Sequence, residues 1–129
     1  MDILAAVTAR LSALGYTADE ADKGALEYNT AKAETYLKSS TNQLEVPEGL
    51  LYVWADMAAG YFLTDKKASG GLSDTYDFGA PAKSISEGDT SVTFALADSG
   101  SFEEQFDAML EKMTHPNEEL ILAFRRLVW

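Results

Sequence analysis

The densest apolar pattern in the sequence lies in residues 48–65, and this segment limits the possible folds more than any other. Its apolar side chains recur every three to four positions, which is typical of a helix that buries one face. Pro47 precedes the pattern and suits the first position of a helix, where a missing N–H costs nothing. We therefore predict a central core helix over residues 48–65. Its apolar residues are Leu50, Leu51, Val53, Trp54, Met57, Ala58, Tyr61 and Phe62.

Four further segments of the sequence have the same helical periodicity. Thr17 and Glu20 have the form of a capping box ahead of the second predicted helix. Asn117 can cap the last one. These predicted helices cover residues 2–14, 18–38, 102–113 and 118–127.

The second predicted helix carries two stripes of small or apolar residues, which predict contacts on two sides. The stripe expected to face the core is small and partly polar, and it consists of Ala21, Ala25, Tyr28, Ala31 or Lys32, Thr35 and Tyr36. The stripe beside it consists of Leu26, Ala33 and Leu37. In the last helix, the residues expected to be buried are Leu120, Ile121, Phe124 and Leu127.

A different pattern separates the third and fourth predicted helices. Residues 66–81 are rich in turn-forming residues and predict a loop. In residues 82–96, two short runs with alternating polar and apolar side chains flank Gly88, which is typical of two strands joined by a tight turn. The expected fold is therefore mainly α. We predict a single domain over residues 1–129, a small bundle of four to five helices with a projecting β-hairpin between the third and fourth helices.

The composition argues against several classes of function. The 129 residues include no cysteine and one histidine, so thiolate chemistry and the usual zinc and Ser-His-Asp sites are not expected. The net charge is −11 and the basic residues are scattered, whereas the basic residues of a protein that binds DNA tightly cluster on one face. No apolar run approaches the roughly 20 residues of a membrane helix, so we expect a soluble protein made inside the cell. We predict no enzymatic activity, no cofactor, no metal and no sequence-specific binding to nucleic acid.

Three stretches, in order, resemble segments of the small head-tail connector (adaptor) proteins of tailed bacteriophages and prophages. They are residues 42–50 with the following Asp56 and Met57, residues 84–94, and residues 124–129. The resemblance extends from about Ala18 to the C-terminus. The sequence departs from the family pattern in two places, since residues 114–117 interrupt the last helix and the loop of residues 69–81 is long.

The resemblance implies a structural protein of the virion, made in the host cytoplasm, that forms a ring beneath the portal. This ring would follow the twelvefold symmetry of the portal, bridge it to the next connector or tail-completion protein, and let DNA pass through its lumen. The residues implied in contacts with other subunits or the portal are Lys83, Ile85, Val92, Phe94, Phe124, Arg125, Arg126 and Trp129. The candidates for acids facing the lumen are Asp74, Asp77, Glu87 and Asp89.

The alternative is a small acidic regulator or inhibitor, such as a DNA mimic. It requires carboxylates on one face at a spacing like that of phosphates. An enzyme is the third alternative. The candidate catalytic residues are the paired acids of the fourth predicted helix, which are more typical of a solvent-exposed helix face than of acid–base catalysis. These acids are Glu103, Glu104, Asp107 and Glu111.

Overall fold

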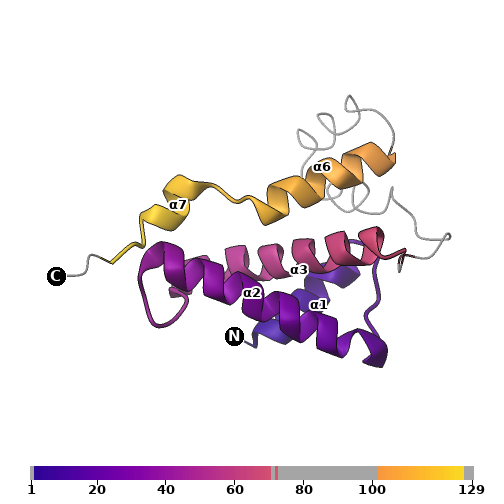
Figure 1. Cartoon of the computed structure of the whole chain (residues 1–129), viewed down its shortest axis with the longest axis horizontal. Helices are drawn as coiled ribbons and strands as arrows, with labels where there is room; N and C mark the ends of the chain where they lie inside the picture. Colours follow the sequence, from indigo (N-terminus) through magenta and orange to yellow (C-terminus); the bar gives the residue numbers. More distant parts are fainter. Residues whose placement is uncertain (1, 71, 73–101, 127–129) are drawn as a thin grey trace.

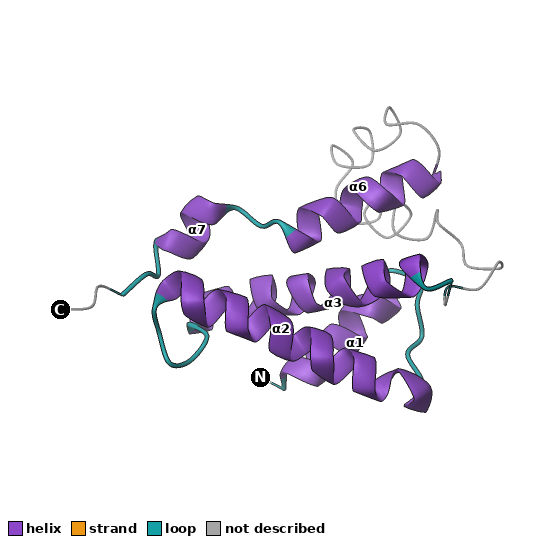
Figure 2. Cartoon of the chain, viewed as in Figure 1, coloured by secondary structure: helices purple, strands orange, loops and turns teal. Residues whose placement is uncertain are grey.

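The computed structural model describes residues 2–70, 72 and 102–126, and these residues form a mainly α four-helix bundle (Figures 1 and 2). The hairpin expected at residues 82–96 and nearly all of the loop expected at residues 66–81 lie outside the described residues. A short fifth helix follows the bundle. The helices are α1 (Ile3–Ala13), α2 (Lys23–Thr41), α3 (Leu51–Ala68), α6 (Phe102–Thr114) and α7 (Glu118–Leu122).

Helix α3 is the centre of the bundle, as its apolar pattern predicts. It packs against α1, α2 and α6, and α6 with α7 forms a layer over α2 and α3 in Figure 1. The crossing of α3 and α6 is close because Gly60 has no side chain: a Cβ there would lie 2.9 Å from Cβ of Met113. The core residues of α3 are Ala55, Met57, Ala58, Ala59, Phe62 and Leu63, joined from α6 by Phe106, Leu110 and Met113.

The core face predicted for α2 is wrong. The stripe of small residues points outward, with Tyr28 66% exposed, and the stripe of Leu26, Ala33 and Leu37 is buried instead. Polar residues complete the buried face, and two of them bond within the bundle. Asn29 donates to the Ala25 carbonyl and to Asp65, and Thr41 donates to the Leu37 carbonyl. The exposed residues of the predicted core stripe are Ala21, Ala25, Tyr28, Ala31, Lys32 and Thr35, while Tyr36 is half-buried.

The second helix also begins and ends later than predicted. The capping residue is Asp19 and not Thr17: its side chain accepts from the Ala21 N–H at 3.0 Å, and the Asp22 carboxylate accepts from the Asp19 N–H at 3.2 Å. A 3₁₀ turn (Glu20–Asp22) follows, and α2 then runs three residues beyond the predicted end at Lys38. Both side chains of this capping box are carboxylates, whereas the prediction relied on a hydroxyl as the cap.

Two other boundaries differ from the prediction. Helix α3 continues to Ala68, so the three residues from Lys66 are helical and do not belong to the loop. Helix α7, capped by Asn117 as predicted, ends at Leu122 rather than near residue 127. It buries Ile121 completely but leaves Leu120 44% exposed, contrary to expectation. The end of α7 is early because the next residues bond to the end of α2.

Candidate interaction surface

The segment after α7 is tied by hydrogen bonds to the end of α2. The Arg126 N–H donates to the Thr41 carbonyl at 2.7 Å, and the Asn42 side-chain amide donates to the Arg126 carbonyl at 2.9 Å. The Gln43 side-chain amide donates to the Phe124 carbonyl at 2.6 Å. Asn42 has φ +54°, in the left-handed region that asparagine tolerates at a helix C-terminus. These bonds hold residues 42–43 and 124–126 together.

A ring contact adds to these bonds. Phe124 is half-buried and lies against Gly49, where a Cβ would come within 2.8 Å of the ring Cε1. Arg125 extends its guanidinium to the Ser40 carbonyl at 3.2 Å. The connection between α2 and α3 and the chain after α7 therefore form one surface at the same end of the bundle (Figure 1).

This end of the bundle exposes four large apolar side chains, and we call it the apolar end. Leu44 is 94% exposed although the residue before it is held by Phe124. Single exposed apolar residues are ordinary on a protein surface, but a group at one end is typical of an interaction site. The residues of the apolar end are Leu44, Tyr52, Leu120 and Leu122.

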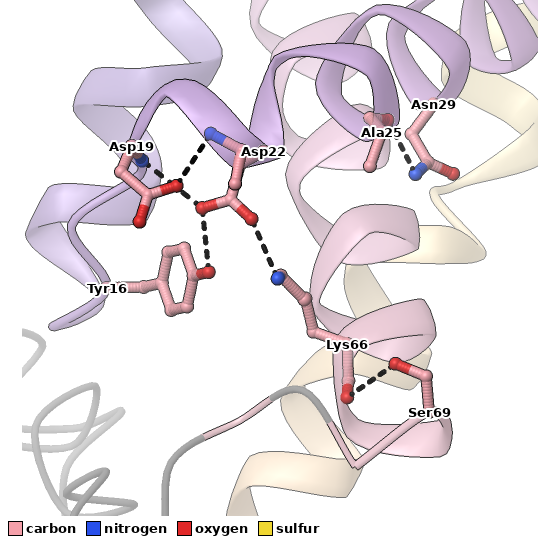
Figure 3. Close-up of polar contacts among 8 residues, drawn as sticks. Tyr16, Asp19, Asp22, Ala25, Asn29, Lys66 and Ser69 are labelled. Carbon is pink, nitrogen blue, oxygen red and sulfur yellow. Dashed lines mark hydrogen bonds and ion pairs between the residues drawn. The ribbon is translucent and has the colours of Figure 1, made fainter.

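At the opposite end of α2, a buried carboxylate joins three elements (Figure 3). Asp22 is 3% exposed and its Oδ1 lies 2.7 Å from Nζ of Lys66 in α3. Its Oδ2 accepts from the Tyr16 hydroxyl at 2.9 Å and from the Asp19 N–H. Tyr16 also packs edge-on against Phe62, with ring centroids 5.4 Å apart. The helical periodicity and the capping pattern of the sequence did not indicate this contact.

The pKa values of this cluster follow from its contacts. Burial alone raises the pKa of the Asp22 carboxyl, but hydrogen bonds from Lys66, Tyr16 and the Asp19 N–H outweigh it and hold the pKa below its usual value. Burial and the bond to Asp22 raise the pKa of Tyr16, and the bond to Asp22 raises that of Lys66. All three groups keep their usual protonation at neutral pH, so the cluster is a structural tie and does not have the poised acid and base of a catalytic site.

A groove of about 640 Å³ lies between α2, α3 and α6. Lys32 crosses it, with Nζ 4.3 Å from the centroid of the Tyr61 ring, and burial raises the pKa of Tyr61. Lys67 forms ion pairs with Asp107 and with Glu103, at 3.2 Å for the latter. These ion pairs join α3 to α6 at the edge of the groove.

A second groove, of about 520 Å³, lies between α1 and the start of α2. Apolar side chains from both elements line it, and exposed acids stand at its edge. We call it the α1–α2 groove. Its residues are Leu4, Thr8, Ala18, Asp19, Glu20, Lys23, Leu26 and Glu27.

The described residues include three of the residues that the resemblance implies in subunit or portal contacts. Phe124, Arg125 and Arg126 lie at the apolar end, where each bonds or packs against the end of α2 or the connection to α3. The others, and the candidates for lumen-facing acids, lie outside the described residues. Those outside are Lys83, Ile85, Val92, Phe94 and Trp129, and the acids Asp74, Asp77, Glu87 and Asp89.

In residues 2–70, 72 and 102–126, no three His, Cys, Asp or Glu side chains come together as a group that could hold a metal ion. No helix in the same part of the chain combines the length and apolar character needed to cross a membrane. The chain matches no protein-family model, no curated protein and no solved structure.

Proposed function

We propose that this protein is a ring-forming head-tail connector of a tailed bacteriophage or prophage. The observation that carries the proposal is the meeting of two of the three stretches that resemble this family. Residues 42–50 and 124–126 are about 80 positions apart in the chain, and hydrogen bonds of 2.6–2.9 Å join them at the apolar end. Two stretches that resembled the family only by chance would not be expected to lie together on one exposed surface.

The proposed mechanism is assembly and not chemistry. The apolar end supplies exposed leucines that a neighbouring subunit can bury, which is favourable by about 1.5–3 kcal/mol for each large side chain fully removed from water. The hairpin expected at residues 82–96 would add strand edges for pairing with neighbours. The assembled ring would bind the portal on one side and the next connector or a tail-completion protein on the other, within the virion.

The charge of the protein fits a conduit for DNA. With a net charge of −11 per chain, a ring of subunits repels the duplex that moves through it, so the DNA slides without sequence-specific binding. Exposed like charges repel each other over only about 8–10 Å at physiological salt, so only acids that face the lumen contribute. Asp74, Asp77, Glu87 and Asp89 are the proposed lumen acids.

Electron microscopy of the purified chain, alone and mixed with a phage portal protein, tests the proposal. We expect rings that stack on the portal and follow its symmetry. The variant Leu44→Asp/Leu122→Asp should lose them, whereas Tyr28→Asp, which changes an exposed apolar residue on α2, should keep them. A chain that forms no ring and does not bind the portal would overturn the proposal.

One observation favours the alternative of an acidic inhibitor. Glu103, Asp107 and Glu111 follow one another at four-residue intervals on the exposed side of α6 and form a row of carboxylates. Lys67 pairs with the first two, which reduces the charge of the row. Displacement of DNA from a basic DNA-binding protein by this chain, with loss of displacement in Asp107→Asn/Glu111→Gln, would favour the inhibitor over the connector.

A further inference from the structure

The apolar end consists of residues from two parts of the chain that are far apart in the sequence. Leu120 and Leu122 belong to residues 118–126, which comprise α7 and the chain after it and which we call the C-terminal strap. Leu44 belongs to the connection between α2 and α3, and Tyr52 to the start of α3. The apolar end is therefore one surface only while the strap lies against the end of α2.

The strap and the end of α2 supply hydrogen-bond donors to each other. The Tyr36 hydroxyl donates to the Glu118 carboxylate at the start of the strap, and the side chains of residues 42–43 donate to two carbonyls near its end. In the other direction, the Arg125 guanidinium and the Arg126 N–H donate to the last two carbonyls of α2. The strap thus caps α2, and the end of α2 holds the strap, so each is less stable when the other moves.

Two apolar side chains complete the attachment of the strap. Ile121 is fully buried, and the half-buried ring of Phe124 lies against Gly49. Helix α7 packs mainly against α2. Movement of the strap away from α2 would expose both side chains to water.

The link between α6 and the strap allows such a movement. Helix α6 ends with its own hydrogen bond, from the His115 N–H to the Glu111 carbonyl, and α7 begins with its own cap at Asn117. These bonds lie on separate sides of Pro116, which has no N–H of its own. Rotation of the chain beside Pro116 can therefore displace the strap without breaking either helix.

The core of the bundle depends little on the strap. The buried apolar side chains of α1, α2, α3 and α6 form one cluster, to which the strap contributes Ile121 and, at the edge, Phe124. An element with few buried contacts can open while the rest of a fold stays intact. Opening of the strap should therefore require less free energy than unfolding of the bundle.

We propose that the C-terminal strap is a conformational switch that opens at Pro116 as one unit and thereby separates the parts of the apolar end. In the closed form, Leu120 and Leu122 lie at the same end of the bundle as Leu44. In the open form they move away, and the connection that carries Leu44 loses the bonds that restrain it. This inference rests on the proposed function, because it makes the surface proposed for assembly available only while the strap is closed.

The absence of cysteine from the sequence allows opening to be measured by thiol labelling. Ile121→Cys places a thiol in the strap, and the matched control Leu63→Cys places one in α3. Both positions are fully buried in the native chain. We expect the folded Ile121→Cys chain to react at least about tenfold faster than Leu63→Cys, because strap opening exposes only the first thiol. Urea unfolding of each variant gives the labelling that global unfolding contributes, and equal rates after this correction would contradict the switch.

A second substitution tests whether the strap and the end of α2 open together. Gln43→Ala removes one hydrogen bond to the strap and should raise the labelling rate of Ile121→Cys by about twofold to tenfold. Thr8→Ala is the control, because it removes a hydrogen bond within α1 and should leave the rate unchanged. An unchanged rate in Gln43→Ala would mean that the connection does not hold the strap.

A covalent lock tests the role of the closed form in assembly. In Ser40→Cys/Arg125→Cys, a short bismaleimide can join the two positions within one chain, since the Arg125 guanidinium lies 3.2 Å from the Ser40 carbonyl. Electron microscopy with a phage portal protein should show at least as many rings after cross-linking as before it. Gln43→Ala/Ile121→Ala, which loosens the strap, should form fewer rings than wild type. Loss of rings on cross-linking, or undiminished rings in the loosened variant, would overturn the inference.

The failure of this inference can be told apart from the failure of the proposed function. Equal labelling of Ile121→Cys and Leu63→Cys, with wild-type rings on the portal, would reject the switch and leave the connector proposal standing. Faster labelling of Ile121→Cys without wild-type rings would reject the connector proposal and the role of the switch in assembly. The strap would then remain only a part of the fold that opens separately.

Discussion

The Asp22 carboxylate and the Lys66 ammonium lie 2.7 Å apart, and the aspartate is almost entirely removed from solvent. The pair joins the 3₁₀ turn before α2 to the last turns of α3, and the Tyr16 hydroxyl extends it to the end of α1. Three of the four bundle helices therefore meet at one charged contact, which no motif in the sequence indicates.

Removal of the charge at Asp22 should destabilise the bundle. Asp22→Asn leaves Lys66 without its partner and weakens two other hydrogen bonds, so we expect a loss of about 2 kcal/mol in the free energy of unfolding. The loss stays below that of a fully buried pair because the Lys66 side chain is 26% exposed and can turn to water. Urea unfolding followed by circular dichroism measures it. Asp2→Asn, at the exposed cap of α1, should change stability less, and equal effects would contradict a special role for Asp22.

The contribution of Asp22 should depend on pH in a defined direction. Its pKa in the folded chain is below the usual 3.8, so its stabilisation is complete above that value and is lost as the pH falls through the folded pKa. The raised pKa values of Tyr16 and Lys66 give the opposite sign: their stabilisation is complete below 10.0 and 10.5 and is lost as the pH rises through the folded values. The stability difference between wild type and Asp22→Asn should thus be constant near neutral pH and shrink below 3.8. A difference that grows in acid would refute the assignment.

The close crossing of α3 and α6 predicts that Gly60→Ala is destabilising. Alanine is the better helix former by about 1 kcal/mol, but its Cβ would lie 2.9 Å from Cβ of Met113 and 3.0 Å from Cγ2 of Thr114. These atoms are close to the α6 backbone and cannot move alone, so the overpacking cost of about 1–3 kcal/mol exceeds the gain. The matched control is Gly24→Ala in α2, where nothing lies within 4 Å of the added Cβ and stability should rise by about 0.5 kcal/mol. Thermal unfolding of both variants shows whether their shifts are opposite in sign.

The contact between Gly49 and Phe124 should control the C-terminal segment. In Gly49→Ala the added Cβ displaces the Phe124 ring, which loosens the bonds from Gln43 to the Phe124 carbonyl and from the Arg126 N–H to Thr41. We expect the Arg126 amide to exchange its hydrogen roughly tenfold faster, because its local opening becomes easier by about 1.4 kcal/mol. Amides in the middle of α3 should keep wild-type exchange rates. Unchanged protection of Arg126 would mean that the ring contact does not hold the segment.

Where the sequence predicted the fold well, the signal was local and apolar. The periodicity of residues 48–65 identified α3 and its central position, because a helix with so much apolar surface has to be covered on several sides. The same reasoning failed on α2, where Asn29 and Thr41 are buried and Tyr28 is exposed. Hydrophobicity alone predicts that Tyr28 is buried and that Asn29 and Thr41 are exposed. The burial is reversed because a polar side chain can lie in a core once it has a hydrogen-bond partner.

The candidate interaction surface was likewise predictable only in part from the sequence. Residues 42–50 and 124–129 were identified in the sequence as separate stretches. The amino-acid sequence alone determined the helical bundle, the cap at Asn117 and the acidic character of the protein. Only the tertiary structure decided that Gln43 meets Phe124 and that Asp22 meets Lys66. Periodicity and capping depend on residues a few positions apart, which a sequence displays directly. The partner of a buried charge or an exposed loop comes from a distant segment, and its position exists only once the helices have packed.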